Sequence, residues 1–166
     1  MTEPPKNEAF LQAYDAYADA LFRHCYFRVY DRERARELMQ ECFMKTWEYL
    51  AKGKEVKNLR AFLYRVANNL VIDESRKKKE ASLDAMAEEQ GFDPPASDRH
   101  GIADQAEVQN ILTRLKELEE HYRQVITMRF IDGLSPSEIA GVLGETENAV
   151  SVRLHRGIKQ LRQMIA

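Results

Sequence analysis

Near the C-terminal end of the chain, six side chains combine polarity, charge and accessibility in a way suited to reading DNA. They are Asn148, Ser151, Val152, His155, Arg156 and Lys159. At 100° per residue they share one face of an expected helix. The opposite face, which we expect to be buried, contains Val150, Leu154, Gly157, Ile158, Leu161 and Ile165. An arginine can fork onto guanine, and an apolar side chain such as Val152 can meet a thymine methyl group. The alternative is a solvated helix that carries one exposed valine.

A second group of side chains suited to nucleic acid lies between residues 59 and 79. It consists of Arg65, Asn68, Asn69, Ile72, Arg76, Lys77, Lys78 and Lys79. Cations fixed along one helix would follow a phosphate backbone, and asparagine can hydrogen-bond the edge of an unstacked base. We expect these residues to lie opposite or beside a buried stripe that includes Leu63, Ala67 and Leu70. A basic helix end that complements its own dipole would give the same composition.

A third surface is polar and mostly acidic. Glu37, Gln40 and Glu41 lie beside the apolar stripe of a helix expected at 32–51. We expect this stripe to be buried, and it consists of Leu38, Met39, Cys42, Phe43, Trp47 and Leu50. Acidic side chains repel DNA, so this surface suits a basic protein partner better. An ordinary solvated face is the alternative interpretation.

The residue types that carry catalysis or bind metal are scattered. The four histidines (His24, His100, His121 and His155) and the two cysteines (Cys25 and Cys42) show no metal-ligand spacing, and there is no glycine-rich phosphate loop. We therefore predict no catalytic residue, no metal site and no cofactor, and a protein that is not an enzyme.

These side chains are positioned by a pattern that is helical nearly throughout. We expect helices at about 7–29, at 32–51 with Asp31 as its cap, and at 59–79, followed by a further helical run at 106–130. The stretch from Ser135 to Glu138 has the form of a capping box. Gly144 permits a tight turn into the last helix, for which Thr146 is the expected cap, so the C-terminal pair resembles a helix-turn-helix.

Charge divides the chain into segments. Residues 52–79 hold 9 basic and 3 acidic residues, a net of +6, whereas residues 80–107 hold 1 basic and 8 acidic residues, a net of −7. The acidic segment also contains Pro94 and Pro95, which favours a linker. The predicted fold class is all-α, with two small helical domains at 1–79 and 108–166 joined by a flexible acidic linker at 80–107.

The compartment is predicted from what the sequence lacks. No apolar run approaches the roughly 20 residues of a membrane span, and the first residues do not read as a signal peptide. Two cysteines within apolar helical surroundings favour free thiols in a reduced cytoplasm. We expect a cytoplasmic protein without membrane insertion.

Three stretches of the chain combine the features described above. They are "ARELMQECFMKTWEYL", "NLRAFLYRVANNLVIDESRKK" and "LEEHYRQVITMRFIDGLSPSEIAGVLGETENAVSVRLHRGIKQLR". Each resembles a motif of the extracytoplasmic-function (ECF) group of bacterial sigma factors, and they occur in family order. A helix-turn-helix alone is shared by many regulators, whereas three motifs at this spacing are much more specific.

The resemblance implies a role for each stretch. The first resembles region 2.2, and implies that Glu37, Gln40 and Glu41 dock on the β′ clamp helices of core RNA polymerase. The second resembles regions 2.3 and 2.4, which melt and read the −10 element, with Asn69 near the melted strand. The third resembles region 4, which reads the −35 element and contacts the β flap. Promoter DNA, core polymerase and an anti-sigma factor are the implied partners.

Several residues depart from the family pattern. Relatives often have other residue types at Ala149, Ser151 and Val152, so the −35 preference of the family does not transfer to this chain. Glu145 replaces a usual apolar residue, and Glu119 a frequent proline. Two other functions stay open at this point: a sigma-like decoy that binds an anti-sigma protein without touching DNA, and a stand-alone regulator that uses only the C-terminal domain.

Overall fold

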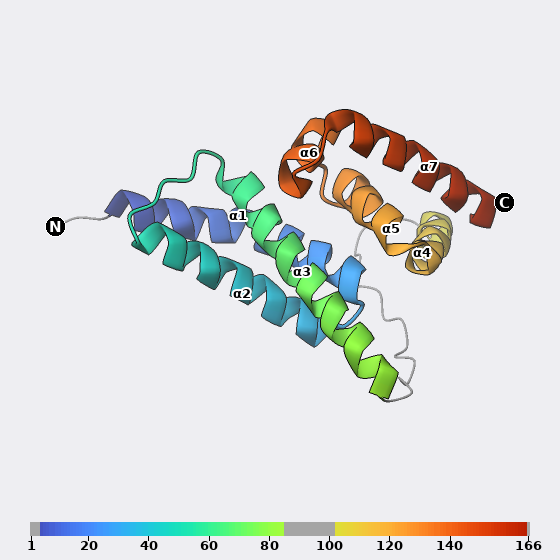
Figure 1. Cartoon of the computed structure of the whole chain (residues 1–166), viewed down its shortest axis with the longest axis horizontal. Helices are drawn as coiled ribbons and strands as arrows, with labels where there is room; N and C mark the ends of the chain where they lie inside the picture. Colours follow the sequence, from blue (N-terminus) through green and yellow to red (C-terminus); the bar gives the residue numbers. More distant parts are fainter. Residues whose placement is uncertain (1–3, 85–101, 166) are drawn as a thin grey trace. The chain divides into compact units, whose positions relative to one another are not determined.

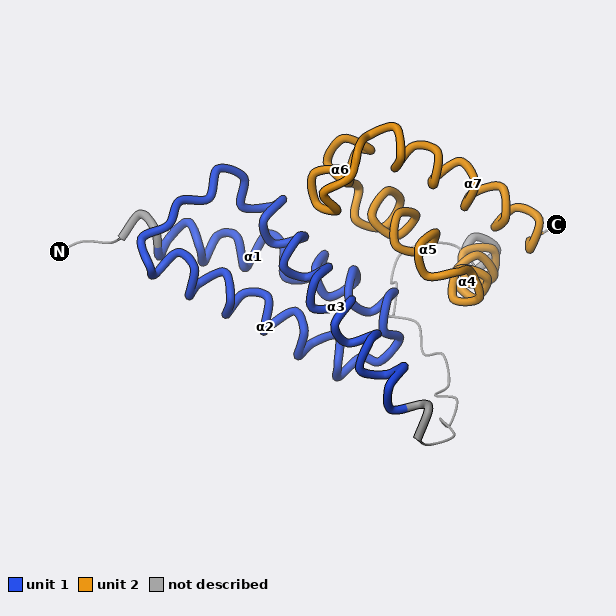
Figure 2. The backbone as a smooth tube through the Cα atoms, viewed as in Figure 1, with its two compact units in different colours: residues 1–89 blue, residues 90–166 orange. Residues whose placement is uncertain are grey.

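The computed structural model describes residues 4–84 and 102–165, and within them the regular secondary structure is entirely helical. The chain divides into two compact units, residues 1–89 and 90–166 (Figures 1 and 2). This confirms the predicted all-α class. In the described ranges, no helix is both long enough and apolar enough to cross a membrane. Most of the predicted linker lies outside the described residues, but its two ends belong to helices.

The first unit is a bundle of three helices that all pack on one another. They are α1 (Pro4–Val29), α2 (Arg32–Ala51) and α3 (Leu59–Asp84) (Figure 1). Leu21, Leu38, Leu63 and Val71 are fully or almost fully buried between them. Burial of this apolar surface is the main force that holds the bundle together. α3 continues five residues past its expected end at Lys79.

Both cysteines are free and buried, as the sequence predicted. The Cys42 thiol donates a hydrogen bond to the Leu63 carbonyl at 3.2 Å and so links α2 to α3. Burial raises the pKa of Cys42 to about 12, because desolvation disfavours the thiolate. Cys42 therefore acts as a core residue rather than as a nucleophile.

The corner between α1 and α2 consists of two residues, Tyr30 and Asp31. Tyr30 has a positive φ of 55°, which ends α1, and its N–H donates to the Tyr26 carbonyl at 2.7 Å. The Asp31 side chain then accepts from the Arg34 backbone N–H at 3.1 Å. The cap predicted at Asp31 is confirmed, and it fixes the direction in which α2 begins.

The second unit holds α4 (Ile102–Glu117), α5 (Glu120–Ile126), the π-helical turn η1 (Thr127–Ile131), α6 (Pro136–Leu143) and α7 (Glu147–Ile165). The helical run expected at 106–130 is interrupted, because the chain leaves helical geometry at Glu119, where ψ is 144°. A straight helix of that length would extend about 37 Å and could not fold back on itself. The break lets α4 and α5 each pack against α7.

The turn between α6 and α7 has the predicted local structure. Ser135 accepts from the Glu138 N–H at 3.1 Å, and Glu138 accepts from the Ser135 N–H at 3.0 Å, which completes the capping box. Gly144 has a φ of 69°, where a residue with a Cβ would be strained. Thr146 caps α7 by accepting from the Ala149 N–H at 3.1 Å.

We expect Ser135→Ala to lower the free energy of unfolding of the second unit by about 1 kcal/mol, because it removes this cap. Thermal unfolding followed by circular dichroism would measure the loss. Ser137→Ala is the matched control, since Ser137 is exposed and lies inside the same helix. Equal unfolding midpoints for the two variants would contradict a stabilising role for the Ser135 cap.

Candidate functional site

The outward face of α7 contains all six residues predicted to contact bases. Asn148, Ser151, His155, Arg156 and Lys159 are exposed, and the Val152 side chain is 40% exposed. On the opposite side Val150, Leu154 and Gly157 are buried, as expected. Ile158 and Leu161, expected on the same side, are half-buried, and Ile165 near the helix end is 38% exposed.

Gly157 sets how closely α7 approaches α5. A Cβ added at this position would lie 3.0 Å from Ile126 Cδ1 and 3.2 Å from Tyr122 Cβ. The close approach buries the inner side of α7 and so turns its polar face outward. Sequence reasoning placed Gly157 on the core side, but the partners Tyr122 and Ile126 come from a separate helix.

An ion pair outside the predicted set shapes the start of α7. The Arg153 guanidinium donates to the Glu145 carboxylate at 2.6 Å. Glu145 was identified above as a departure from the family pattern, and this contact gives it a partner across the turn. The eight-residue separation is not a helical spacing, so periodicity could not reveal the pair. Arg153 is drawn toward the turn, whereas Arg156 lies exposed on the outward face.

A surface hollow of about 590 Å³ continues the outward face toward the end of α7. Its lining residues are His155, Ile158, Lys159, Arg162 and Gln163. Three of these residues, His155, Lys159 and Arg162, are of basic type, which suits a phosphate better than an apolar ligand. Arg162 was not among the predicted DNA-contacting residues.

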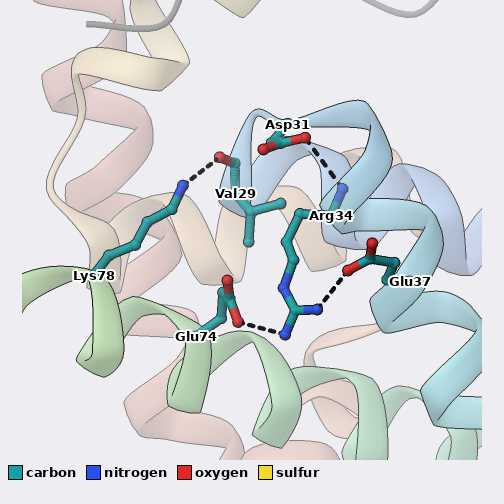
Figure 3. Close-up of polar contacts among 6 residues, drawn as sticks. All are labelled: Val29, Asp31, Arg34, Glu37, Glu74 and Lys78. Atoms are coloured by element: carbon teal, nitrogen blue, oxygen red, sulfur yellow. Dashed lines mark hydrogen bonds and ion pairs between the residues drawn. The ribbon is translucent and has the colours of Figure 1, made fainter. Parts of the chain in front are cut away.

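The outward face of α3 agrees with the prediction at most positions. Arg65, Asn69, Arg76, Lys77, Lys78 and Lys79 are exposed, and Ile72 is half-buried. Some of the cations are already in contact with the protein: Arg76 lies 4.0 Å from Asp73, and the Lys78 ammonium lies 3.5 Å from the Val29 carbonyl at the end of α1 (Figure 3).

Asn68 corrects the prediction. Its side chain is only 2% exposed, and its Oδ1 accepts from Arg28 Nη1 at 3.0 Å. α3 packs against both α1 and α2, so its buried arc is wider than the single stripe that periodicity indicated. A buried guanidinium requires hydrogen-bond acceptors, and Asn68 supplies one. The expected outward position of Asn68 is therefore wrong.

The polar surface of α2 is connected to α3 through Arg34. The Arg34 guanidinium donates to Glu37 at 2.7 Å and to Glu74 of α3 at 2.7 Å (Figure 3). The hydrogen bond from Arg34 holds the pKa of the Glu74 carboxyl below its usual value, and the two carboxylates raise the pKa of Arg34. Glu37 and Gln40 are exposed, whereas Glu41 is half-buried.

An apolar groove of about 720 Å³ lies beside this surface, between α1 and α2, and Gln40 forms part of its wall. The lining residues are Asn7, Phe10, Leu11, Tyr14, Gln40, Phe43, Met44, Trp47 and Glu48. Leu11 and Met44 are each 63% exposed. Trp47 was expected in the buried stripe but is 41% exposed, with its ring 5.0 Å from that of Phe10. Sequence reasoning missed the groove because it treated each apolar stripe as core.

Comparisons with known proteins match both units. The family model described as Sigma-70 region 2 matches residues 13–81, and that of Sigma-70, region 4 matches residues 108–161. The chain is 31% identical over 170 residues to the ECF RNA polymerase sigma factor SigW of Bacillus subtilis, covering 96% of this chain and 90% of that protein.

Two further proteins extend the comparison. The ECF RNA polymerase sigma factor BldN of Streptomyces coelicolor is 28% identical over 164 residues, which cover 95% of this chain and 61% of that longer protein. Among solved structures, the sigma factor RpoE of Bartonella quintana, in complex with the anti-sigma factor NepR, is similar in fold. Its TM-score is 0.77 at 20% identity, with 95% of this chain and 97% of that chain covered.

Proposed function

Since the chain belongs to the ECF group of RNA polymerase sigma factors, a regulatory subunit family that directs promoter-specific transcription initiation, we propose how its surfaces divide that work. The outward face of α7 reads the −35 element as duplex DNA. The exposed residues of α3 hold the −10 element. The polymerase supplies the nucleotide chemistry. Because bacterial RNA polymerase works in the cytoplasm, we propose that this protein acts there as well.

The observation that carries the −35 proposal is the sorting of side chains on α7. Five polar or basic residues and Val152 are exposed on one side, while Val150, Leu154 and Gly157 are buried on the other. In a helix-turn-helix, the second helix enters the major groove with such a face. A partly exposed valine has a use there, because it can contact a thymine methyl group.

For the −10 element we propose that Asn69 contacts an unpaired base and that the basic segment, Arg76–Lys79, contacts phosphates. Asn69 is exposed on the same helix as this segment. Flipping a base out of the stack costs a few kcal/mol, which contacts in a pocket must offset. Arg65 and Ile72 complete the proposed surface, and the buried Asn68 is not part of it.

We propose that Glu37, Gln40 and Glu41 face the β′ clamp helices of core polymerase. Their surface is acidic and continuous with the apolar groove through Gln40. An anti-sigma factor is the other proposed partner, in line with the complex in which the similar RpoE structure was solved.

Run-off transcription tests the proposed function directly. Sigma-free core polymerase supplied with the chain and with genomic fragments should produce discrete transcripts that core enzyme alone does not. DNA binding without initiation would favour a stand-alone regulator. Binding to an anti-sigma protein with neither DNA binding nor initiation would favour a decoy.

A further inference from the structure

Arg34 joins two parts of the first unit to which the proposed function gives different partners. Its guanidinium lies between Glu37, on the surface proposed for polymerase, and Glu74, on the helix proposed for the −10 element (Figure 3). The Glu74 side chain is only 14% exposed and that of Arg34 is 31% exposed, so solvent screens their ion pair only in part. The Asp31 cap fixes the backbone from which Arg34 reaches α3.

Glu74 has other cations within reach. Lys77 and Lys78 follow it by three and four residues on α3, and both favour its ionised form electrostatically. At these spacings side chains meet on one helix face, and a glutamate placed four residues before a lysine is the better orientation for an ion pair. The carboxylate of Glu74 can therefore form an ion pair either with Arg34 or with the lysines of its own helix.

Two cations of the basic segment, Arg76–Lys79, already contact other groups of the protein. Arg76 already lies near Asp73, and Lys78 is directed to the Val29 carbonyl. If Glu74 turned to Lys77 or Lys78, a further cation would be neutralised where the DNA backbone is expected. Phosphate binding depends on the number of cations that displace counterions, so each cation lost is measurable.

We propose that Arg34 is a positioning residue that holds Glu74 away from the lysines of α3 and so keeps the basic segment available to the phosphates of promoter DNA. This inference rests on the proposed −10 role of α3. It assigns to Arg34, which lies outside every predicted DNA-contacting set, an effect on DNA binding that acts through Glu74.

The test compares reconstituted holoenzymes that carry wild-type chain, Arg34→Met, Glu74→Gln, or both changes. The probe is a labelled DNA duplex of random sequence with a preformed single-stranded bubble, titrated from about 50 to about 200 mM salt. Arg34→Met should make the slope of log affinity against log salt shallower by about 0.9, the value for one phosphate contact. Between these two salt concentrations, this difference in slope means that the loss of affinity is roughly threefold smaller for Arg34→Met than for the wild-type chain. The double variant should recover the wild-type slope, because glutamine cannot neutralise a lysine.

Each result has a distinct meaning. If the double variant is as impaired as Arg34→Met, or if Arg34→Met leaves the slope unchanged, the proposal is overturned. Thermal unfolding of each variant shows whether a substitution destabilises the fold. A loss of stability caused by Arg34→Met would not be expected to disappear when Glu74→Gln is added, so recovery of the salt slope in the double variant indicates an effect of charge. Lys77→Ala checks the premise independently. An unchanged salt slope for Lys77→Ala would refute the phosphate contact of the basic segment. A shallower slope for Lys77→Ala together with an unchanged slope for Arg34→Met would refute only the role of Arg34.

Discussion

Arg156→Ala should weaken binding of the holoenzyme to its promoter by about 5- to 150-fold, with little change in its affinity for core polymerase. Arg156 is exposed on the outward face of α7, while the neighbouring Arg153 is engaged by Glu145. A bidentate arginine–guanine contact is worth about 1–3 kcal/mol of discrimination, which sets the expected range. Electrophoretic mobility shifts on promoter fragments would measure it.

Two comparisons separate base recognition from general charge. Arg114→Ala is the matched control, since Arg114 is an arginine of α4 in the same unit, paired with Glu117 at 3.2 Å. It should leave promoter binding unchanged. Substituting each base pair of the −35 element in turn should then reveal one position at which wild type discriminates and Arg156→Ala does not. Loss of core polymerase binding equal to the loss of promoter binding would rule out the proposed division of labour.

The structure allows this specific choice because the local rules at the helix-turn-helix were sufficient. The cap at Ser135, the left-handed Gly144 and the cap at Thr146 each depend on residues within four positions, and all three were predictable. Once the start of α7 is fixed, a period of 3.6 residues determines which side chains point outward. The sequence therefore predicted which polar side chains of α7 point outward.

The first unit was less predictable because its decisive contacts join distant residues. Arg34 and Glu74 are 40 positions apart, as are Arg28 and Asn68. No pattern within a single helix reveals such pairs. The apolar groove beside Trp47 was also not predictable from one helix, because the packing of neighbouring helices decides whether an apolar stripe is buried or lies on the surface. The helices and their caps could be predicted, but the width of the buried arc of α3 could not.

Adjacent asparagines on α3 illustrate the consequence. Asn68 is buried and bound to Arg28, whereas Asn69 is exposed next to it. By residue type and position in the sequence both were candidates for contact with the melted strand. Packing gives the first a role in stability and leaves the second available to DNA.

Substituting each asparagine in turn should therefore produce two different defects. Asn69→Ala should reduce open-complex formation, seen as weaker permanganate reactivity of unpaired thymines. Flipping a base out of the stack costs a few kcal/mol, and the substitution removes one of the contacts that offset this cost. Its thermal unfolding and its binding to duplex DNA should stay close to wild type. Asn68→Ala should instead lower the free energy of unfolding by about 1–3 kcal/mol, since it removes an acceptor from the buried guanidinium of Arg28.

The pair serves as its own control, because the two substitutions are chemically identical and adjacent. An unchanged permanganate footprint with Asn69→Ala would count against its contact with the melted strand. Normal stability of Asn68→Ala, combined with a defect in strand melting, would mean that the first unit rearranges on promoter DNA and exposes the side chain that this structure buries. The same variants thus test both the site and the packing that defines it.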